Sequence, residues 1–261
     1  MTEIRPRTDN ELTDWITESA DRLREIAAVV GSREPVPACE PWTMRQLVAP
    51  VISGLSGWYT YNLTHGDAPL DLVAAWDAQP ELPRGNAERL CHLGRVAEEF
   101  ERLVESLDLD APCYVFQDVR TARGWLLRAA TECALHVQDA EETLGEPAPF
   151  TPERAATSID ETLRYMWRGA LVIRRDPGGE RVPDEPFGLF ADDLDLGWHV
   201  TKAPDRFIVE HIGSRRELPA LSVAGDQAQL IAWMWGRRVG GNLDFGGEQE
   251  LVDVWNLVAG L

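Results

Sequence analysis

The feature that most constrains the fold is a helical repeat of apolar residues in the first 145 positions. Four separate stretches carry apolar side chains every three or four residues, with charged residues between them. This spacing gives each helix one apolar stripe, which has to be buried against another element. Four such helices predict an antiparallel bundle. The stretches cover residues 10–30, 43–58, 86–107 and 121–144.

The apolar pattern changes beyond residue 150. Residues 151–174 have the length of one more helix, and a stretch rich in proline, glycine and charge follows, to residue 186. Later runs alternate apolar and polar residues, which is typical of half-buried strands. The predicted strands cover residues 197–201, 206–212 and 221–223, and helices are expected over 226–238 and 251–258.

These patterns predict an α+β fold in three segments. A four-helix bundle is expected over residues 1–150, a helix and linker over 151–185, and a small α+β domain over 186–261. The chain has 261 residues, enough to bury a sizeable core without disulfides or metal.

Charge and cysteine usage exclude several classes of function. The net charge is −19 and Lys202 is the only lysine, so the surface repels a phosphate backbone and nucleic-acid binding is not expected. No apolar run is long enough to span a membrane, and the N-terminus lacks the apolar core of a signal peptide. The four cysteines are irregularly spaced and are expected to be reduced thiols. The sequence therefore predicts a cytoplasmic protein.

Glu132 and His136 stand four residues apart in the fourth helical stretch. This spacing brings both side chains to one face of a helix. A carboxylate and an imidazole that converge inside a bundle can ligate a metal ion, with at least one further ligand from another helix. The alternative is an ordinary ion pair on a solvated helix face, and spacing alone does not separate the two.

Pro50 lies about two turns inside the second helical stretch, for which Thr43 is the predicted N-cap. Proline removes one backbone hydrogen bond and collides with the carbonyl of Gln46, which costs about 3 kcal/mol. We therefore expect the helix either to kink or to restart at Pro50.

Three stretches resemble the family of mycothiol-dependent maleylpyruvate isomerases, whose N-terminal part is a DinB-like four-helix bundle. The sequence PWTMRQLVA resembles the opening of the family's second helix, and ECALHVQDA resembles its Glu-x-x-x-His-x-x-Asp-Ala signature. The sequence WMWGR resembles the Gly-Arg helix end of its C-terminal domain. They occupy residues 41–49, 132–140 and 233–237, in the family's order. The resemblance implies a DinB-like bundle followed by a small α+β domain, and mycothiol as cofactor.

In that family two histidines and a glutamate hold a divalent metal, typically zinc. The resemblance assigns two of the three ligands to Glu132 and His136, and places Pro50 where the other histidine belongs. Proline offers no ligand atom, so the metal site is expected to be degraded and zinc binding is not favoured. The substitute donors that the sequence leaves open are His65, His92 and Cys133.

The resemblance also identifies Arg237 with the family's active-site arginine, which binds a substrate carboxylate. The alternative is a charge that complements the helix dipole at a helix end. Trp198 and Trp235 are candidates for stacking on a ligand, in a cleft expected between bundle and C-terminal domain.

Together these residues favour an enzyme over a binding protein. The predicted activity is a metal-independent isomerase, lyase or cyclase of specialised metabolism, in which Glu132 and His136 exchange protons on a small anionic substrate. Two alternatives stay open: a zinc-dependent mycothiol S-transferase or isomerase with a substitute ligand, and a non-catalytic small-molecule-binding protein. A homodimer is also left open.

Overall fold

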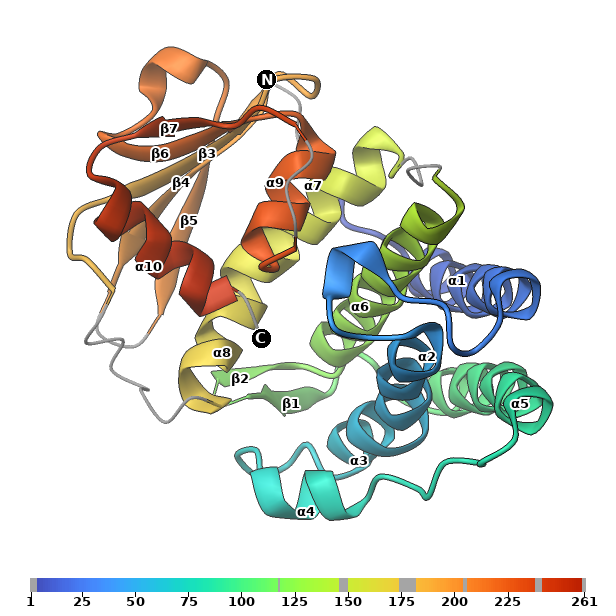
Figure 1. Cartoon of the computed structure of the whole chain (residues 1–261). Coiled ribbons are helices and arrows are strands. Elements are labelled where there is room, and N and C mark those ends of the chain that lie inside the picture. The colour runs from blue at the N-terminus through green and yellow to red at the C-terminus, as the bar shows by residue number, and fades with distance from the viewer. Residues whose placement is uncertain are drawn as a thin grey trace. The chain divides into compact units, whose positions relative to one another are not determined.

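The computed structural model describes residues 4–116, 118–145, 150–173, 182–203, 206–237 and 241–259. The chain divides near residue 148 into two compact units, and the second also includes the residues before Pro6. Helices dominate the first unit, whereas the second combines a sheet with helices (Figure 1).

The first unit is a bundle of the four predicted helical segments. Helix α1 packs against α5 and α6, and α2 packs against the same two helices. Buried apolar side chains such as Trp15, Leu47 and Phe100 fill the interior between them. The helices are α1 (Asp9–Val30), α2 (Met44–Ser53), α3 (Tyr59–Thr64), α5 (Asn86–Glu105) and α6 (Arg123–Glu141).

Side-chain caps explain where two of these helices begin. Thr8 accepts a hydrogen bond from the backbone N–H of Glu11, whose carboxylate accepts from the N–H of Thr8. Thr43 and Gln46 make the same reciprocal arrangement at the start of α2. Such a capping box satisfies N–H groups that have no partner inside the helix. The predicted N-cap at Thr43 is confirmed.

Pro50 does not interrupt its helix. Helix α2 continues to Ser53, and the N–H of Gly54 donates to the carbonyls of both Pro50 and Val51. A π-helical turn, Gly54–Trp58, then leads directly into α3. A restart at Pro50 is therefore wrong, and the helical run extends beyond residue 58 to Thr64 because the irregular turn keeps the backbone helical.

The first unit also contains short elements that apolar periodicity does not predict. Helix α4 (Leu72–Asp77) lies in the connection between α3 and α5, and its N-cap Asp71 accepts from two backbone N–H groups. Strands β1 (Pro112–Val115) and β2 (Asp118–Thr121) form an antiparallel hairpin before α6. Four residues are too few to establish a period of two, so the sequence pattern does not predict this hairpin.

The second unit is built on a five-stranded sheet with the order β5-β4-β3-β6-β7. Strands β3 and β6 pair in parallel, and the other neighbours are antiparallel. The three predicted strands correspond to β4, β5 and β6. The strands are β3 (Phe187–Ala191), β4 (Leu196–Lys202), β5 (Phe207–Ile212), β6 (Leu221–Gly225) and β7 (Asp244–Gly246).

Helices accompany this sheet in the second unit. The helix predicted over 151–174 is present as α7, a π-helical turn and α8, and it contacts α9, β5 and α10. Most of the predicted linker lies outside the described residues. The helix predicted over 226–238 is shorter than expected: it ends at Met234, and Gly236 then takes a left-handed φ of 65°. The helices are α7 (Pro152–Glu161), the turn Thr162–Met166, α8 (Trp167–Ile173), α9 (Gln227–Met234) and α10 (Gln249–Ala259).

Aromatic packing holds the interior of the second unit together. The ring centroids of Trp167 and Phe187 each lie 4.8 Å from that of Trp255, and all three residues are buried. The cluster therefore joins α8 and α10 to the central strand β3.

Within the described ranges, no helix combines the length and the hydropathy that a membrane span requires.

Candidate functional site

Helix α6 carries Glu132 and His136 on one face. His136 is buried, with 5% of its surface exposed, and the Glu132 side chain is 26% exposed. Nε2 of His136 lies 3.9 Å from Oε1 of Glu132. The pair is therefore largely shielded from water, unlike an ion pair on a solvated helix face.

Two buried side chains hold the Glu132 carboxylate. The hydroxyl of Tyr59 and Nη2 of Arg128 both donate hydrogen bonds to Oε2 of Glu132, the latter at 3.2 Å. Burial raises the pKa of the Glu132 carboxyl, but Arg128, His136 and the Tyr59 hydrogen bond outweigh it, so the pKa lies below its ordinary value of 4.5. Burial and the nearby Glu132 charge raise the pKa of Tyr59 well above 10.0. At neutral pH, Glu132 is therefore charged and Tyr59 remains a donor.

His136 is oriented by neighbours on both sides of its ring. Nδ1 lies 3.3 Å from Oδ2 of Asp139, which is also buried. The ring of Trp42 stacks on the imidazole, with the centroids 6.5 Å apart and the planes at 27°. Because a carboxylate at Nδ1 fixes the ring orientation, Nε2 is the nitrogen that faces Glu132 and is left for chemistry.

The π-helical turn before α3 aims Tyr59 at Glu132. A regular α-helix rotates by about 100° per residue, so Tyr59 would point about 80° away from the buried Val51. A π-helical turn acts as one inserted residue, which brings Tyr59 to within about 20° of Val51. The irregular turn thus directs Tyr59 to the interior, where its hydroxyl reaches α6.

In the sequence, position 50 falls between Trp42 and Tyr59, the two residues of this segment that contact the Glu132–His136 pair. Trp42 comes eight residues before Pro50 and stacks on His136, and Tyr59 comes nine residues after it and bonds to Glu132. Over the described part of the chain, no three His, Cys, Asp or Glu residues are grouped so that they could hold a metal ion. Among the described residues, the donors at this site thus fall short of the three protein ligands that zinc normally takes in catalytic sites.

The three substitute donors make other contacts. The ring of His65 stacks on that of Tyr61 at 4.4 Å, and its Nδ1 lies 3.0 Å from the Tyr61 carbonyl oxygen. His92 lies on α5, with Nδ1 2.5 Å from a nitrogen of Arg95. Cys133 is buried, and burial together with Glu132 raises the pKa of its thiol. Among the described residues, none of these donors joins the Glu132–His136 pair in a group of potential metal ligands.

The other predicted site residues lie in the second unit. Nη1 of Arg237 donates to the carbonyl of Trp235 at 2.8 Å, at the end of α9, and the guanidinium carbon lies 5.8 Å from the Trp235 ring centroid. Nε1 of Trp235 donates to Thr162, and Trp235 is buried. Trp198 in β4 has no exposed surface. These contacts are those of a charged side chain at a helix end for Arg237 and of core side chains for the two tryptophans. Ligand binding by the three residues stays a prediction.

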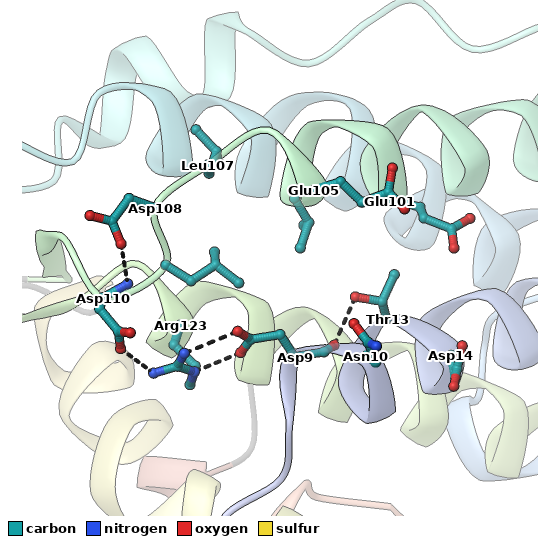
Figure 2. Close-up of a pocket in the computed structure, with 12 residues that line it drawn as sticks. Asp9, Asn10, Thr13, Asp14, Glu101, Glu105, Leu107, Asp108, Asp110 and Arg123 are labelled. Carbon is teal, nitrogen blue, oxygen red and sulfur yellow. Dashed lines mark hydrogen bonds and ion pairs between the residues drawn. The ribbon is translucent and has the colours of Figure 1, made fainter.

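A pocket of about 550 Å³ lies elsewhere in the first unit, and none of the predicted site residues lines it. Figure 2 shows Arg123 between two carboxylates of this pocket, with Nε donating to Asp9 at 2.6 Å and Nη1 donating to Asp110 at 2.5 Å. Arg123 thereby ties the start of α1 and the loop after α5 to the start of α6. The acidic lining residues are Asp9, Asp14, Glu101, Glu105, Asp108 and Asp110.

The first unit matches a known family of protein domains. Residues 16–141 match the family model of the mycothiol maleylpyruvate isomerase N-terminal domain. The first unit belongs to this domain family. The resemblance that the sequence motifs suggested is therefore confirmed, and the family is a mycothiol-dependent one.

Solved structures share the fold over almost the whole chain. The crystal structure of the mycothiol-dependent maleylpyruvate isomerase is 14% identical, with a TM-score of 0.58, and the match covers 96% of this chain and 98% of that chain. A histidine-to-alanine mutant of that isomerase matches with a TM-score of 0.55 at the same identity and coverage. The predicted α+β fold, a helical bundle followed by a small α+β unit, is confirmed. No match was found among curated protein sequences.

Four residues around the pair were not assigned roles from the sequence: Trp42, Tyr59, Arg128 and Asp139. Two of them had a readable signal, because Arg128 precedes Glu132 by four residues and Asp139 follows His136 by three, so both lie on the same helix face. Tyr59 had no such signal, because the π-helical turn decides where it points.

Proposed function

We propose that this protein is a metal-independent isomerase, lyase or cyclase that acts on a small anionic molecule. The observation that carries the proposal is the buried line Asp139–His136–Glu132, in which the imidazole lies between two carboxylates. A base held by an orienting group, with one nitrogen left for the substrate, is the usual arrangement for proton transfer.

The contacts give the two site residues different roles. His136 is the group that takes and returns a proton at Nε2, because Asp139 holds Nδ1. Glu132 is a weak base at neutral pH, since its pKa lies below its ordinary value, and it serves to stabilise the imidazolium form of His136 across 3.9 Å. Proton transfer by a positioned side chain contributes about 10²–10⁴-fold to a rate.

A second candidate is a zinc-dependent mycothiol S-transferase or isomerase. It is favoured by one observation: histidines that ligate metals commonly have their other nitrogen bonded to a carboxylate, as His136 does with Asp139. Mycothiol is the cofactor of this candidate, because the family is mycothiol-dependent. Arg237 is proposed to bind a substrate carboxylate in either case.

Maleylpyruvate, on which the solved relative is named to act, is the first substrate to test. Turnover is measured with chelator-treated protein, with and without zinc and mycothiol, and related small carboxylates are screened by their effect on thermal stability. We expect turnover without metal, a loss of about 100-fold or more in His136→Asn, and a smaller loss in Glu132→Gln. His65→Ala is the matched control and should retain full activity.

Three results would contradict the proposal. If zinc co-purifies near one equivalent and chelation abolishes turnover, the zinc-dependent candidate takes its place. If His136→Asn and Glu132→Gln both keep full activity, the pair is not catalytic. If a carboxylate binds and none is turned over, the protein is a non-catalytic binding protein.

A further inference from the structure

We propose that Arg128 replaces the positive charge of a metal ion at Glu132 and, together with the hydroxyl of Tyr59, disfavours zinc at this site. The inference deepens the proposed function, because it rests on the metal-independent site and names the residues that keep the ion out. Pro50 is then only one of two obstacles to zinc binding.

The positive charge of Arg128 disfavours a second cation beside Glu132. Arg128 is 1% exposed, and a guanidinium remains charged at every pH that a protein survives. Its Nη2 lies 3.2 Å from Oε2 of Glu132. Zinc binds a carboxylate oxygen at about 2.0–2.2 Å, so an ion on Oε2 would lie no more than about 5.4 Å from Nη2. Repulsion between the two cations is poorly screened at a buried site, and zinc is therefore disfavoured.

Hydrogen bonds already occupy one oxygen of the Glu132 carboxylate. An ionised carboxylate oxygen has about two lone pairs for hydrogen bonds or metal bonds. Oε2 of Glu132 already accepts from Tyr59 and from Arg128. The other oxygen, Oε1, faces Nε2 of His136 at 3.9 Å. A zinc ion would have to displace at least one buried donor to bind Oε2, and that donor would lose its partner. An ion that leaves both donors in place can therefore use Oε1 alone.

A consequence follows for residue 50. In the position that the family resemblance implies for residue 50, Pro50→His would supply a third donor, but it would leave the guanidinium and the tyrosine bond in place. We expect Pro50→His alone to bind zinc weakly, and the double variant Pro50→His/Arg128→Gln to bind it at least 100-fold more tightly.

The test is zinc affinity of the chelator-treated full chain, measured by competition with a chromophoric chelator. The double variant Pro50→His/Arg128→Lys keeps the buried charge and should bind zinc as weakly as Pro50→His. The double variant Pro50→His/Arg24→Gln is the matched control for net charge, because Arg24 lies on α1 with a side chain that is 41% exposed. This control variant should not bind zinc more tightly than Pro50→His.

Tight zinc binding by Pro50→His alone, or by the unchanged protein, would overturn the inference, and so would a folded Pro50→His/Arg128→Gln variant that gains nothing. Circular dichroism and thermal melting check the fold of each variant. If Arg128→Gln does not fold, Pro50→His/Tyr59→Phe replaces it: loss of the hydroxyl should raise affinity about 3–10-fold over Pro50→His, and no gain would again overturn the inference.

The zinc measurement uses no substrate, so it separates this inference from the proposed function. No zinc gain, with turnover in chelated protein that depends on His136, would overturn the inference alone. A zinc gain without any His136-dependent turnover would overturn the proposed function alone.

Discussion

Arg128→Met and Glu132→Gln, made singly and together, measure how strongly the buried ion pair of α6 is coupled. The Arg128 side chain is 1% exposed and the Glu132 side chain 26%, and their nearest charged atoms are 3.2 Å apart. Each single change leaves the other group without this partner, whereas the double change removes both charges. The difference between the double change and the sum of the single changes is the coupling energy.

The geometry sets the expected magnitude. Two unit charges at 3.2 Å attract by about 5 kcal/mol at an effective dielectric constant of 20, which is a gross figure before desolvation. An exposed pair at this helical spacing contributes only about 0.3–0.5 kcal/mol. Since one partner is fully buried and the other is partly hydrated, we expect a coupling energy of about 1.5–3 kcal/mol.

The assay is urea unfolding at neutral pH, followed by far-UV circular dichroism. The two units can unfold in separate transitions, so the coupling is taken from the transition that Arg128→Met shifts. The pair Arg95 and Glu99 on α5 is the matched control: it has the same spacing and order, but the atoms are 3.9 Å apart and the side chains are 59% and 54% exposed. Its coupling energy should not exceed about 0.5 kcal/mol.

A coupling energy for Arg128 and Glu132 no larger than that of the control pair would refute the reasoning. It would mean that the guanidinium does not compensate the Glu132 charge. Arg128 could then not take the place of a metal cation on electrostatic grounds.

Two further predictions concern other parts of the structure. Pro50→Ala should stabilise the first unit by about 1–3 kcal/mol, because it restores an N–H for the Gln46 carbonyl inside α2; a lower melting temperature would show that packing of the proline ring outweighs this bond. In the second unit, Asp160 accepts from Nε2 of His211 at 2.9 Å and from Nε of Arg164 at 2.7 Å. Burial raises the pKa of the Asp160 carboxyl, but these two partners outweigh it and hold the pKa in the folded protein below 3.8. The charged Asp160 therefore stabilises the fold at pH values above the pKa of the unfolded chain. This stabilisation is lost as the pH falls toward the pKa of the folded protein. Unfolding measured from neutral pH to below pH 3.8 should show Asp160→Asn most destabilising at neutral pH, and a difference independent of pH would contradict this.

The helices of the bundle could be predicted because their apolar stripes follow one fixed period. The same holds for β4, β5 and β6, whose starts and ends differ from the prediction by only a few residues. The central strand β3 was missed for a physical reason: its buried residues, Phe-Gly-Leu-Phe-Ala, include no polar side chain, so no period of two is visible, whereas the equally buried β6 has Ser222 between Leu221 and Val223. Strand β7 has only three residues, too few for a pattern.

In the candidate site, too, some placements follow from the sequence and others depend on tertiary packing. Glu132, His136, Arg128 and Asp139 lie on one helix, so their mutual placement follows from the rotation per residue and is contained in the sequence. That residue 50 offers no side-chain donor is also a property of the sequence, because the proline side chain has no ligand atom in any fold.

Only the tertiary structure decided which groups from other segments reach this face. The burial of Arg128, the stacking of Trp42 on His136 and the hydroxyl of Tyr59 on Glu132 depend on how helices pack. One π-helical turn changes the direction of every later side chain by about 100°, and no local pattern in the sequence reports it. Contacts within a helix are set by a constant period, whereas contacts between helices are set by the packing of the whole unit.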